Sequence, residues 1–268
     1  MPTDEAEQTR LAVTHQAFLL LLDGRLTMAH IQDNVKRILD IGTGPGDWAI
    51  AMGERYPNAE IIATDISACQ PTQVPLNVVF QYDDAQENWT YTAPFDYIHI
   101  RGMAGAFTDW ASIYAKAVRH LEPNGTIEVA DFGSIKLERE SPDSYVSIYN
   151  GACQSAAEKA GTPIGLGHLK RASLESAGFS VMKSMSMEVP LGMWSPDPHK
   201  RLVGKMALIS ALEGLEAASM RLLTKELAWK AEDVQDLCMR VQEEVCNPTA
   251  HASMQCQFVL ARRLVLPE

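Results

Sequence analysis

The chain has 268 residues, and its 34 acidic side chains outnumber its 23 basic ones, which gives a formal net charge of −11. A surface this acidic repels nucleic acid unless a basic groove is present, and no cluster of Lys and Arg with interleaved aromatic residues occurs. No apolar stretch approaches the roughly 18 residues that a membrane span needs. The five cysteines form no Cys-x-x-Cys pair, which indicates reduced thiols in the cytoplasm and no zinc site.

Short apolar runs alternate with helical patterns through the first half of the chain. A helix and a turn are expected over 11–31, strands near 37–41, 60–64, 77–82, 95–100 and 125–131, and helices near 46–55 and 108–121. Several of the strand runs lack polar alternation, as expected of strands that are covered on both faces. The alternation predicts an α/β fold with a doubly wound, mostly parallel sheet.

The second half continues with helices near 142–160 and 168–177, strands over 180–189 and 253–262, and a helical pattern over 200–246. The segment between the last two strands is too long for a hairpin loop, so it is expected to form a helical cap. We therefore expect a single domain, in which residues 1–35 are an N-terminal helical segment, 36–190 the ligand-binding core, 191–250 the cap and 251–268 the last strand.

Residues 38–46 read ILDIGTGPG, which is a strand that ends in an acid and a glycine loop. Such loops hold nucleotide ligands, but the spacing Gly42-x-Gly44-x-Gly46 does not by itself say which one. No Gly-Lys-Ser/Thr follows, so the loop is not a P-loop. The carboxylate of Asp40 would repel a pyrophosphate and attract a cation. This favours S-adenosylmethionine, which carries an ammonium and a sulfonium and no phosphate.

Acidic residues also follow the second and third strands. Asp65 lies where an acid grips ribose hydroxyls in either a dinucleotide or an adenosyl cofactor. In the turn after the third strand, Asp83 or Asp84 can accept a hydrogen bond from the adenine amino group, and the next backbone N–H, that of Ala85, can donate to the ring. Any one of these acids would also fit a helix cap or an ordinary loop.

The run ILDIGTGPGDWAIAMGERYPNAEIIATDIS resembles the first two motifs of the class I S-adenosylmethionine-dependent methyltransferases. The segments NVVFQYDDAQENWTY and HLEPNGTIEVADF are similar to those of the fungal LaeA-like methyltransferases, and the similarity covers most of the chain. The resemblance implies a Rossmann-like, seven-stranded sheet whose last strand is antiparallel.

The resemblance also implies which residues hold the cofactor. Asp40, Gly42, Thr43, Gly44 and Gly46 surround the methionyl part and the sulfonium, Asp65 and Ile66 contact the ribose and adenine, Asp84 and Ala85 hold the adenine edge, and Arg101 faces the methionyl group. Pro45 and Asp47 depart from the usual loop of the family, although both suit the start of a helix.

Four residues are candidates for catalysis, because a hydroxyl acceptor benefits from a general base by about 10²–10⁴-fold whereas a carboxylate acceptor needs none. His99 shares a strand face with Arg101 and is the first candidate, although a buried core histidine fits equally. His168 lies at the start of a predicted helix and is either a base or a cap residue. Asp131 either orients the acceptor or simply ends its strand. His15 reaches the pocket if the first helix crosses it. No cluster with metal-ligand spacing is present, so no metal is expected.

The sequence thus predicts a methyltransferase of fungal secondary metabolism that acts on a hydroxyl or carboxyl oxygen of a small hydrophobic or aromatic natural product. Two alternatives stay open: a LaeA-like regulator that acts through protein partners, and a pericyclase or dehydratase that retains its cofactor. A homodimer is also expected, because capped relatives of this fold often pair.

Overall fold

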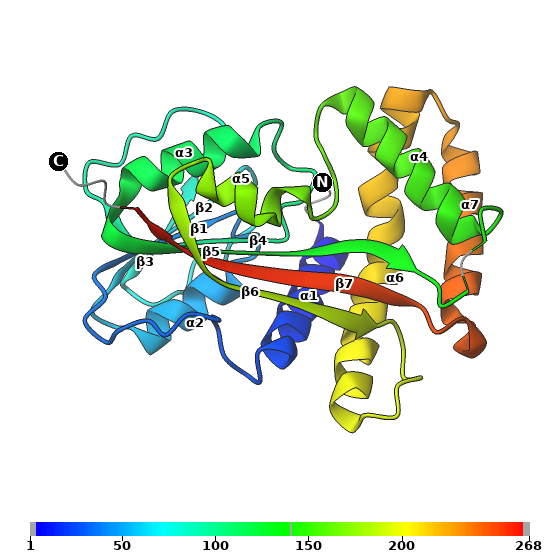
Figure 1. Ribbon diagram of the computed structural model, residues 1–268, viewed down its shortest axis with the longest axis horizontal. Helices are drawn as coiled ribbons and strands as arrows, with labels where there is room; N and C mark the ends of the chain where they lie inside the picture. Colours follow the sequence, from blue (N-terminus) through cyan, green and yellow to red (C-terminus); the bar gives the residue numbers. More distant parts are fainter. Residues whose placement is uncertain (1–3, 140, 265–268) are drawn as a thin grey trace. The chain divides into compact units, whose positions relative to one another are not determined.

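The computed structural model describes residues 4–139 and 141–264. Within these residues the strands form a seven-stranded sheet in the order β3-β2-β1-β4-β5-β7-β6. The strands are β1 (Arg37–Ile41), β2 (Glu60–Asp65), β3 (Val78–Tyr82), β4 (Phe95–Arg101), β5 (Leu121–Lys136), β6 (Phe179–Pro190) and β7 (Ser253–Arg263). β7 runs opposite to its neighbours β5 and β6 (Figure 1). The doubly wound α/β fold with one antiparallel strand is therefore confirmed.

The helices fill the intervals between the strands. They are α1 (Glu5–Leu21), α2 (Asp47–Arg55), α3 (Trp110–His120), α4 (Tyr145–Ala160), α5 (Arg171–Glu175), α6 (Pro198–Leu227) and α7 (Ala231–Cys246), with short 3₁₀ turns η1 (Gly167–Leu169) and η2 (Pro248–Ala250). α1 begins earlier than expected, because the side chain of Asp4 accepts a hydrogen bond from the backbone N–H of Glu7 and caps the helix. β5 is longer than expected, and the helix predicted over 168–177 is divided into η1 and α5.

The chain forms two compact units, which are described separately. Among the described residues, the sheet unit contains 24–131, 166–186 and 257–264, and the helical unit contains 4–23, 132–139, 141–165 and 187–256. Residues 1–3 and 265–268, the two ends of the expected single domain, lie outside the described residues. The division of that domain at 35, 190 and 250 stays a prediction.

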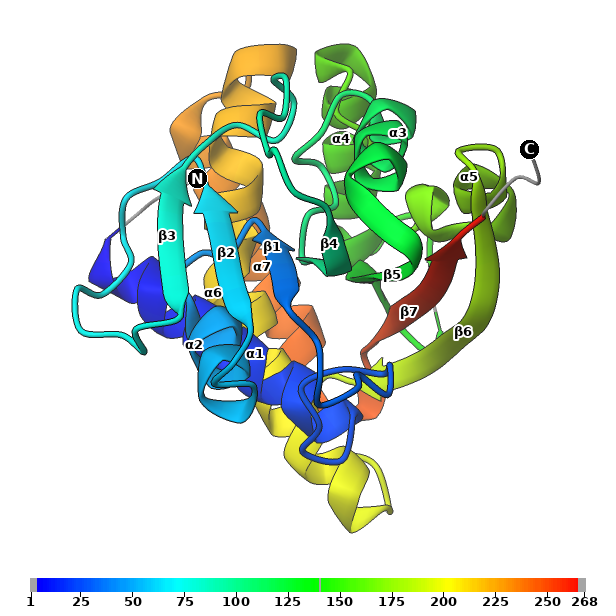
Figure 2. The ribbon, with the colours of Figure 1, turned by 90° about the vertical axis from the view of Figure 1, so that its left-hand side faces the viewer.

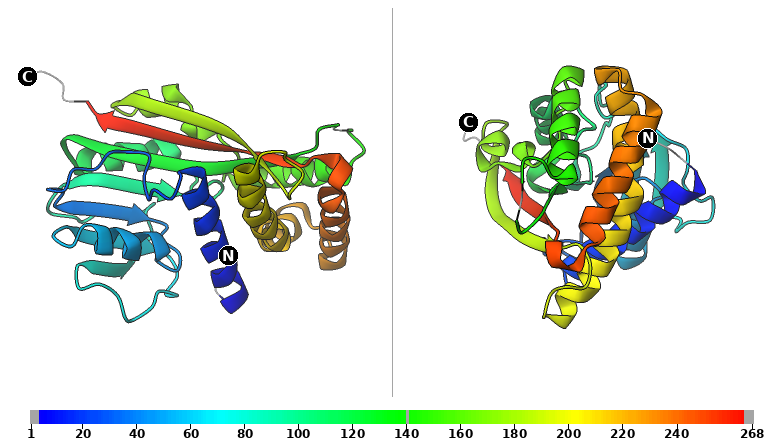
Figure 3. Two further views of the ribbon diagram at one scale, coloured as in Figure 1. Left: turned by 90° about the horizontal axis from the view of Figure 1, so that it is seen from below. Right: turned by 90° about the vertical axis from the view of Figure 1, so that its right-hand side faces the viewer.

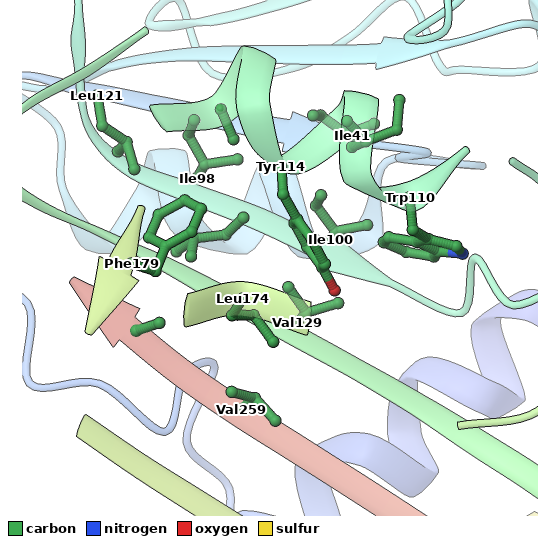
Figure 4. Packing of buried hydrophobic residues seen from close by; sticks show 14 of the residues in the cluster. Ile41, Ile98, Ile100, Trp110, Tyr114, Leu121, Val129, Leu174, Phe179 and Val259 are labelled. Atoms are coloured by element: carbon green, nitrogen blue, oxygen red, sulfur yellow. The ribbon is translucent and has the colours of Figure 1, made fainter. Parts of the chain in front are cut away.

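In the sheet unit, two apolar clusters cover the two faces of the sheet. Figure 2 shows β3, β2 and β1 side by side with α2 next to them. On the α2 face, Trp48 and Met52 cluster with Ile38 and Tyr97. On the other face, aromatic side chains of α3 cover aliphatic residues of β4, β5 and β7 (Figure 4). Successive residues of a strand therefore face different helices, and this alternation decides which polar residues can meet.

The helical unit contains α1, α4, α6 and α7. α6 spans 30 residues and starts where the side chain of Asp197 accepts hydrogen bonds from two backbone N–H groups of its first turn. Thr14 Oγ1 and Ser210 Oγ, 2.5 Å apart, link α1 to α6. α6 and α7 run side by side (Figure 3). None of the helices in the described part of the chain is long and apolar enough to cross a bilayer.

Candidate functional site

The loop between β1 and α2 needs glycine at three positions. Gly42, Gly44 and Gly46 have φ angles of 72°, 57° and 92°, a region in which residues with a Cβ are strained. A Cβ on Gly42 would lie 2.2 Å from the Sδ of Met103, and a Cβ on Gly46 would lie 2.4 Å from the ring of Phe80. The three glycines are thus required by the backbone conformation, and Gly46 is required also by the ring of Phe80, whereas the flexible end of Met103 beside Gly42 could move.

Gly44 is held from both sides by residues that follow β2. Its N–H donates to Asp65 Oδ2 at 2.8 Å, and its carbonyl accepts from Gln70 Nε2 at 2.8 Å. Asp65 Oδ1 accepts from the backbone N–H and the hydroxyl of Ser67 at 2.9 and 2.6 Å. A carboxylate has about four acceptor sites, so Asp65 retains capacity for a further donor such as a ribose hydroxyl. The sequence pattern indicated Asp65, but nothing in it indicated Gln70.

The start of α2 offers donors that no described side chain satisfies. Gly46 caps the helix without a side-chain hydrogen bond, which leaves the first N–H groups of α2 without a side-chain partner. Thr43 Oγ1 is buried and has no hydrogen-bond partner among the described residues. Buried polar groups are normally satisfied, so these groups fit a ligand with a carboxylate and hydroxyls. The methionyl and ribosyl parts of S-adenosylmethionine provide both.

Asp40 forms a buried pair with His99. Its Oδ1 lies 2.7 Å from His99 Nδ1, and the two residues are 2% and 3% exposed. Trp48 stacks flat on the imidazole, with ring centroids 3.7 Å apart and planes inclined by 6°. The pair forms because the two residues are register partners on adjacent strands β1 and β4. Asp40 was expected to face the cationic part of the cofactor, and the sequence did not indicate that a histidine engages one of its oxygens.

Asp84 and Ala85 lie in a tight turn after β3. The backbone N–H of Glu87 donates to the carbonyl of Asp84, and the N–H of Gln86 donates to Asp84 Oδ1, both at 2.9 Å. The neighbouring Asp83 uses its N–H to bind the carbonyl of Asp65 at 3.0 Å. The turn that was expected to hold adenine is therefore fixed by its own hydrogen bonds and tied to the end of β2.

A second histidine–aspartate pair lies at the end of β5. His168 Nε2 is 2.8 Å from Asp131 Oδ2, and both residues are buried. The N–H of Ala104 donates to Asp131 Oδ1 at 3.2 Å. Burial raises the pKa of Asp131, and the neighbouring His168 opposes this effect only in part. The structure therefore brings together two of the four catalytic candidates.

Trp110 lies beside this second pair. Its indole stacks on the ring of His168 with centroids 3.9 Å apart and planes inclined by 14°. Its Nε1 is buried and has no hydrogen-bond partner in the part of the chain that the structure describes. Figure 4 shows this nitrogen at the end of the indole that points away from the labelled aliphatic residues. Trp110 was not among the residues predicted for the site, and the one signal for it in the sequence is its place at the start of a predicted helix.

The remaining predicted residues have other surroundings. Ile66 follows β2 and is 65% exposed, next to the ribose-binding candidate Asp65. Arg101 ends β4 opposite Ala130 of β5 and is engaged in contacts of its own. His15 is buried on α1 in the helical unit. Over residues 4–139 and 141–264, no three His, Cys, Asp or Glu side chains gather as metal ligands would.

The family of the chain follows from its sequence similarity over this region. The methyltransferase domain model matches residues 13–181. The chain belongs to this methyltransferase family. Family membership confirms S-adenosylmethionine as the cofactor, and the glycine loop and its unsatisfied donors fit that ligand.

Two curated fungal proteins are similar to this methyltransferase over nearly its whole length. Methyltransferase pytC of Aspergillus terreus is 32% identical over 266 residues, which cover 98% of this chain and 82% of that protein. The secondary metabolism regulator LAE1 of Cochliobolus heterostrophus is 33% identical over 280 residues, which cover 98% of this chain and 89% of that protein. The LaeA-like group inferred from the motifs is thereby confirmed.

Among solved structures, the [4+2]-cyclase SpnF is similar in fold to this methyltransferase. The TM-score is 0.55 at 17% sequence identity, and the match covers 93% of this chain and 81% of that chain. At this identity the likeness supports the fold alone.

Proposed function

We propose that this methyltransferase methylates a hydroxyl oxygen of a small, hydrophobic natural product and that His168 is its general base. The observation that carries the proposal is the buried pair of His168 and Asp131, with an imidazole nitrogen 2.8 Å from a carboxylate oxygen. A carboxyl acceptor would need no base, so the pair favours a hydroxyl acceptor. The similarity to a methyltransferase and a regulator of fungal secondary metabolism supports the natural-product class.

S-adenosylmethionine, when bound, supplies a methyl group on a positively charged sulfonium. The protein's part is to hold the acceptor hydroxyl in line and to take its proton. Asp131 accepts the N–H at Nε2 of His168, and this tautomer leaves the lone pair on Nδ1. His168 Nδ1 takes the proton, and the resulting imidazolium is stabilised by the carboxylate and by the face of Trp110. General base catalysis of this kind contributes about 10²–10⁴-fold.

Trp110 provides a hydrogen-bond donor for the same acceptor. Its buried Nε1–H has no partner in the described chain, and a ligand oxygen would satisfy it. Phe107 packs edge-on against the indole at a centroid distance of 4.9 Å, so the surroundings are apolar. This combination of one donor, one base and an apolar aromatic wall suits a small aromatic or polyketide acceptor.

We assign a different role to His99, which the sequence placed first among the candidate bases. His99 is enclosed by Trp48 and bound to Asp40, at the centre of adjacent strands. In this position it holds the Asp40 carboxylate below the glycine loop. We therefore propose that His99 supports cofactor binding and that proton transfer depends on His168.

The decisive experiment is to incubate the purified protein with cofactor labelled in the methyl group and a panel of phenols, enols and carboxylic acids. Label in an oxygen of the product, together with an equal amount of S-adenosylhomocysteine, would support the proposal. Labelled esters as the only products would contradict a hydroxyl acceptor. The cytoplasmic location and the homodimer expected from the sequence belong to this proposal, and fractionation and light scattering test them.

A regulatory role is the second candidate, because LAE1 of Cochliobolus heterostrophus is named as a regulator and is 33% identical to this chain. A regulator of this kind would bind a protein partner and methylate none of the small acceptors. The cofactor-retaining alternative would convert a substrate while no S-adenosylhomocysteine appears. The same incubation, analysed for both products, separates these outcomes.

A further inference from the structure

The lysine of α3 is buried in the sheet unit. Lys116 is 7% exposed, and its Nζ donates to three consecutive backbone carbonyls. The acceptors are Ala85 at 3.1 Å, Gln86 at 2.5 Å and Glu87 at 2.7 Å. An ammonium has three N–H donors, so this set of carbonyls satisfies all of them. Lys116 thereby joins α3 to the turn that follows β3.

This turn carries the two groups assigned to the adenine edge. The carbonyl of Asp84 points into the turn, where it accepts from the N–H of Glu87. In a planar trans peptide the C=O and the N–H point in opposite directions. The N–H of Ala85 belongs to the same peptide as the Asp84 carbonyl, so it points out of the turn, as a donor to a ligand must.

The next peptide, between Ala85 and Gln86, connects Lys116 with the carboxylate of Asp84. Its carbonyl accepts from Lys116 Nζ and also from Trp89 Nε1 at 2.9 Å. Its N–H, on the opposite side of the same plane, donates to Asp84 Oδ1 at 2.9 Å. The ammonium therefore fixes the orientation of this peptide, and the peptide in turn fixes one oxygen of Asp84.

We propose that Lys116 is a positioning residue that makes the cofactor site selective for adenine. The inference rests on the proposed assignment of adenine to Asp84 and Ala85. Adenine presents an amino donor and a ring acceptor on one edge, and these match the carboxylate of Asp84 and the N–H of Ala85. Lys116 acts through these two groups, because loss of its three hydrogen bonds allows the turn to rotate and misaligns both.

The experiment compares S-adenosylhomocysteine with S-inosylhomocysteine by calorimetry. Hypoxanthine replaces the amino donor by a carbonyl and the ring acceptor by an N–H, so it reverses both groups that the turn recognises. The wild-type protein should prefer the adenosyl compound by about 10–100-fold, since hydrogen bonds that involve a charged group are the stronger ones. The ratio of the two affinities cancels any loss of binding that is common to both ligands.

Lys116→Met keeps an apolar stem of similar length and removes the charge and all three donors. The preference for adenine should fall below about threefold, and binding of the adenosyl compound should weaken by roughly tenfold or more. Lys116→Arg keeps the charge, but a planar guanidinium cannot direct three donors from one point, so the ratio should fall at least about threefold. The Arg variant carries the test if the Met variant does not fold.

Tyr114→Phe is the matched control. It removes another hydrogen bond from α3 to a backbone carbonyl, that of His168 at 3.1 Å, without touching the turn. This variant should retain the wild-type preference for adenine. An unchanged preference in a folded Lys116 variant would overturn the inference, and the proposed methyl-transfer function would still stand. A wild-type protein that binds both compounds equally would instead overturn the assignment of adenine to the turn.

Discussion

Nε2 of His168 lies 2.8 Å from Oδ2 of Asp131, and the imidazole is covered by the indole of Trp110. The Asp40–His99 pair repeats this arrangement with Trp48 as the covering ring. Asp131 points to the same face of the sheet as Ile127 and Val129, which belong to the apolar cluster covered by α3. His99 points to the same face as Tyr97, which belongs to the apolar cluster on the side of α2. The two pairs therefore lie on opposite faces of one sheet. We assign one to the acceptor and the other to the cofactor loop.

Replacing Asp131 by Asn should abolish the base without unfolding the protein. The Asn side-chain amide would donate to His168 Nε2 and so move the ring proton to Nδ1, which removes the lone pair that accepts the substrate proton. Turnover should fall by about 10²–10⁴-fold while the affinity for S-adenosylhomocysteine stays within about twofold. Turnover is measured by an assay of methyl transfer, and the affinity for S-adenosylhomocysteine is measured by calorimetry. A variant with normal turnover would remove His168 from the mechanism.

The same substitution has a defined effect on the pH dependence of stability. Burial raises the pKa of Asp131, so the stabilising contribution of its protonated form is lost as pH rises through the folded-state pKa. The neutral Asn does not titrate. The free energy of unfolding of the variant minus that of wild type should therefore be larger at pH 7.5 than at pH 4, so that the variant gains in relative stability as pH rises. Urea denaturation at the two pH values checks this, and the opposite sign would show that His168 outweighs burial.

Substitutions of His99 should separate structural support from proton transfer. His99→Ala leaves Asp40 as a buried, unpaired carboxylate, and breaking a buried pair in this way costs about 3–5 kcal/mol of stability. His99→Asn keeps a donor at the position of Nδ1 and should recover part of that stability and most of the cofactor affinity. Turnover of the Asn variant at saturating cofactor should stay within about tenfold of wild type. If turnover of the Asn variant fell by about 10²-fold or more, as expected for loss of a general base, His99 would again be the candidate base.

Asp65 should be required for cofactor binding. In Asp65→Asn, one of the two oxygens becomes an NH₂ group, which cannot accept from Gly44 or from Ser67. The affinity for S-adenosylhomocysteine should fall by at least about tenfold. Glu87→Gln removes one negative charge from a nearby turn and should leave the affinity within about twofold. Equal losses in both variants would indicate a general effect of charge.

Trp110→Phe should distinguish a donor to the acceptor from simple packing. Phenylalanine keeps an aromatic face toward His168 and loses the buried Nε1–H, which has no partner among the described residues, together with part of the ring volume. Thermal stability should fall modestly, because the smaller ring leaves a cavity, and KM for the acceptor identified in the panel should rise about 3–10-fold with kcat little changed. A loss of stability with unchanged KM would assign Trp110 to the core alone.

Much of the fold could be predicted from the sequence because its signals are local. The run over residues 37–41 is apolar, ends in a glycine loop and forms β1 as expected. The end of β5 could not be placed, because Gly133 and Ser134 interrupt the apolar run beyond Asp131 as a turn would. The glycine loop and Asp65 were likewise evident from spacing along the chain.

The partners of the site residues could not be predicted, because they come from distant parts of the chain. Asp40 and His99 are 59 residues apart in the sequence and meet only because β4 lies beside β1. In the sequence, Lys116 resembles an ordinary exposed charged residue of a helix. The sole clue to its burial is that it follows Ile113 by three residues, within the apolar stripe of α3. A single sequence does not reveal that three carbonyls surround it.

The position of β7 between β5 and β6 has a consequence for the order of folding. β6 ends at Pro190 and β7 begins at Ser253, so the ribosome must make α6 and α7 before β6 can gain its neighbour. Until then one edge of β5 has no partner strand. The sheet is completed only when β7, which is far along the chain, pairs with both β5 and β6. Such closure is slow, and it makes the interval between synthesis of β6 and insertion of β7 the period in which this protein is most exposed to aggregation and to chaperones.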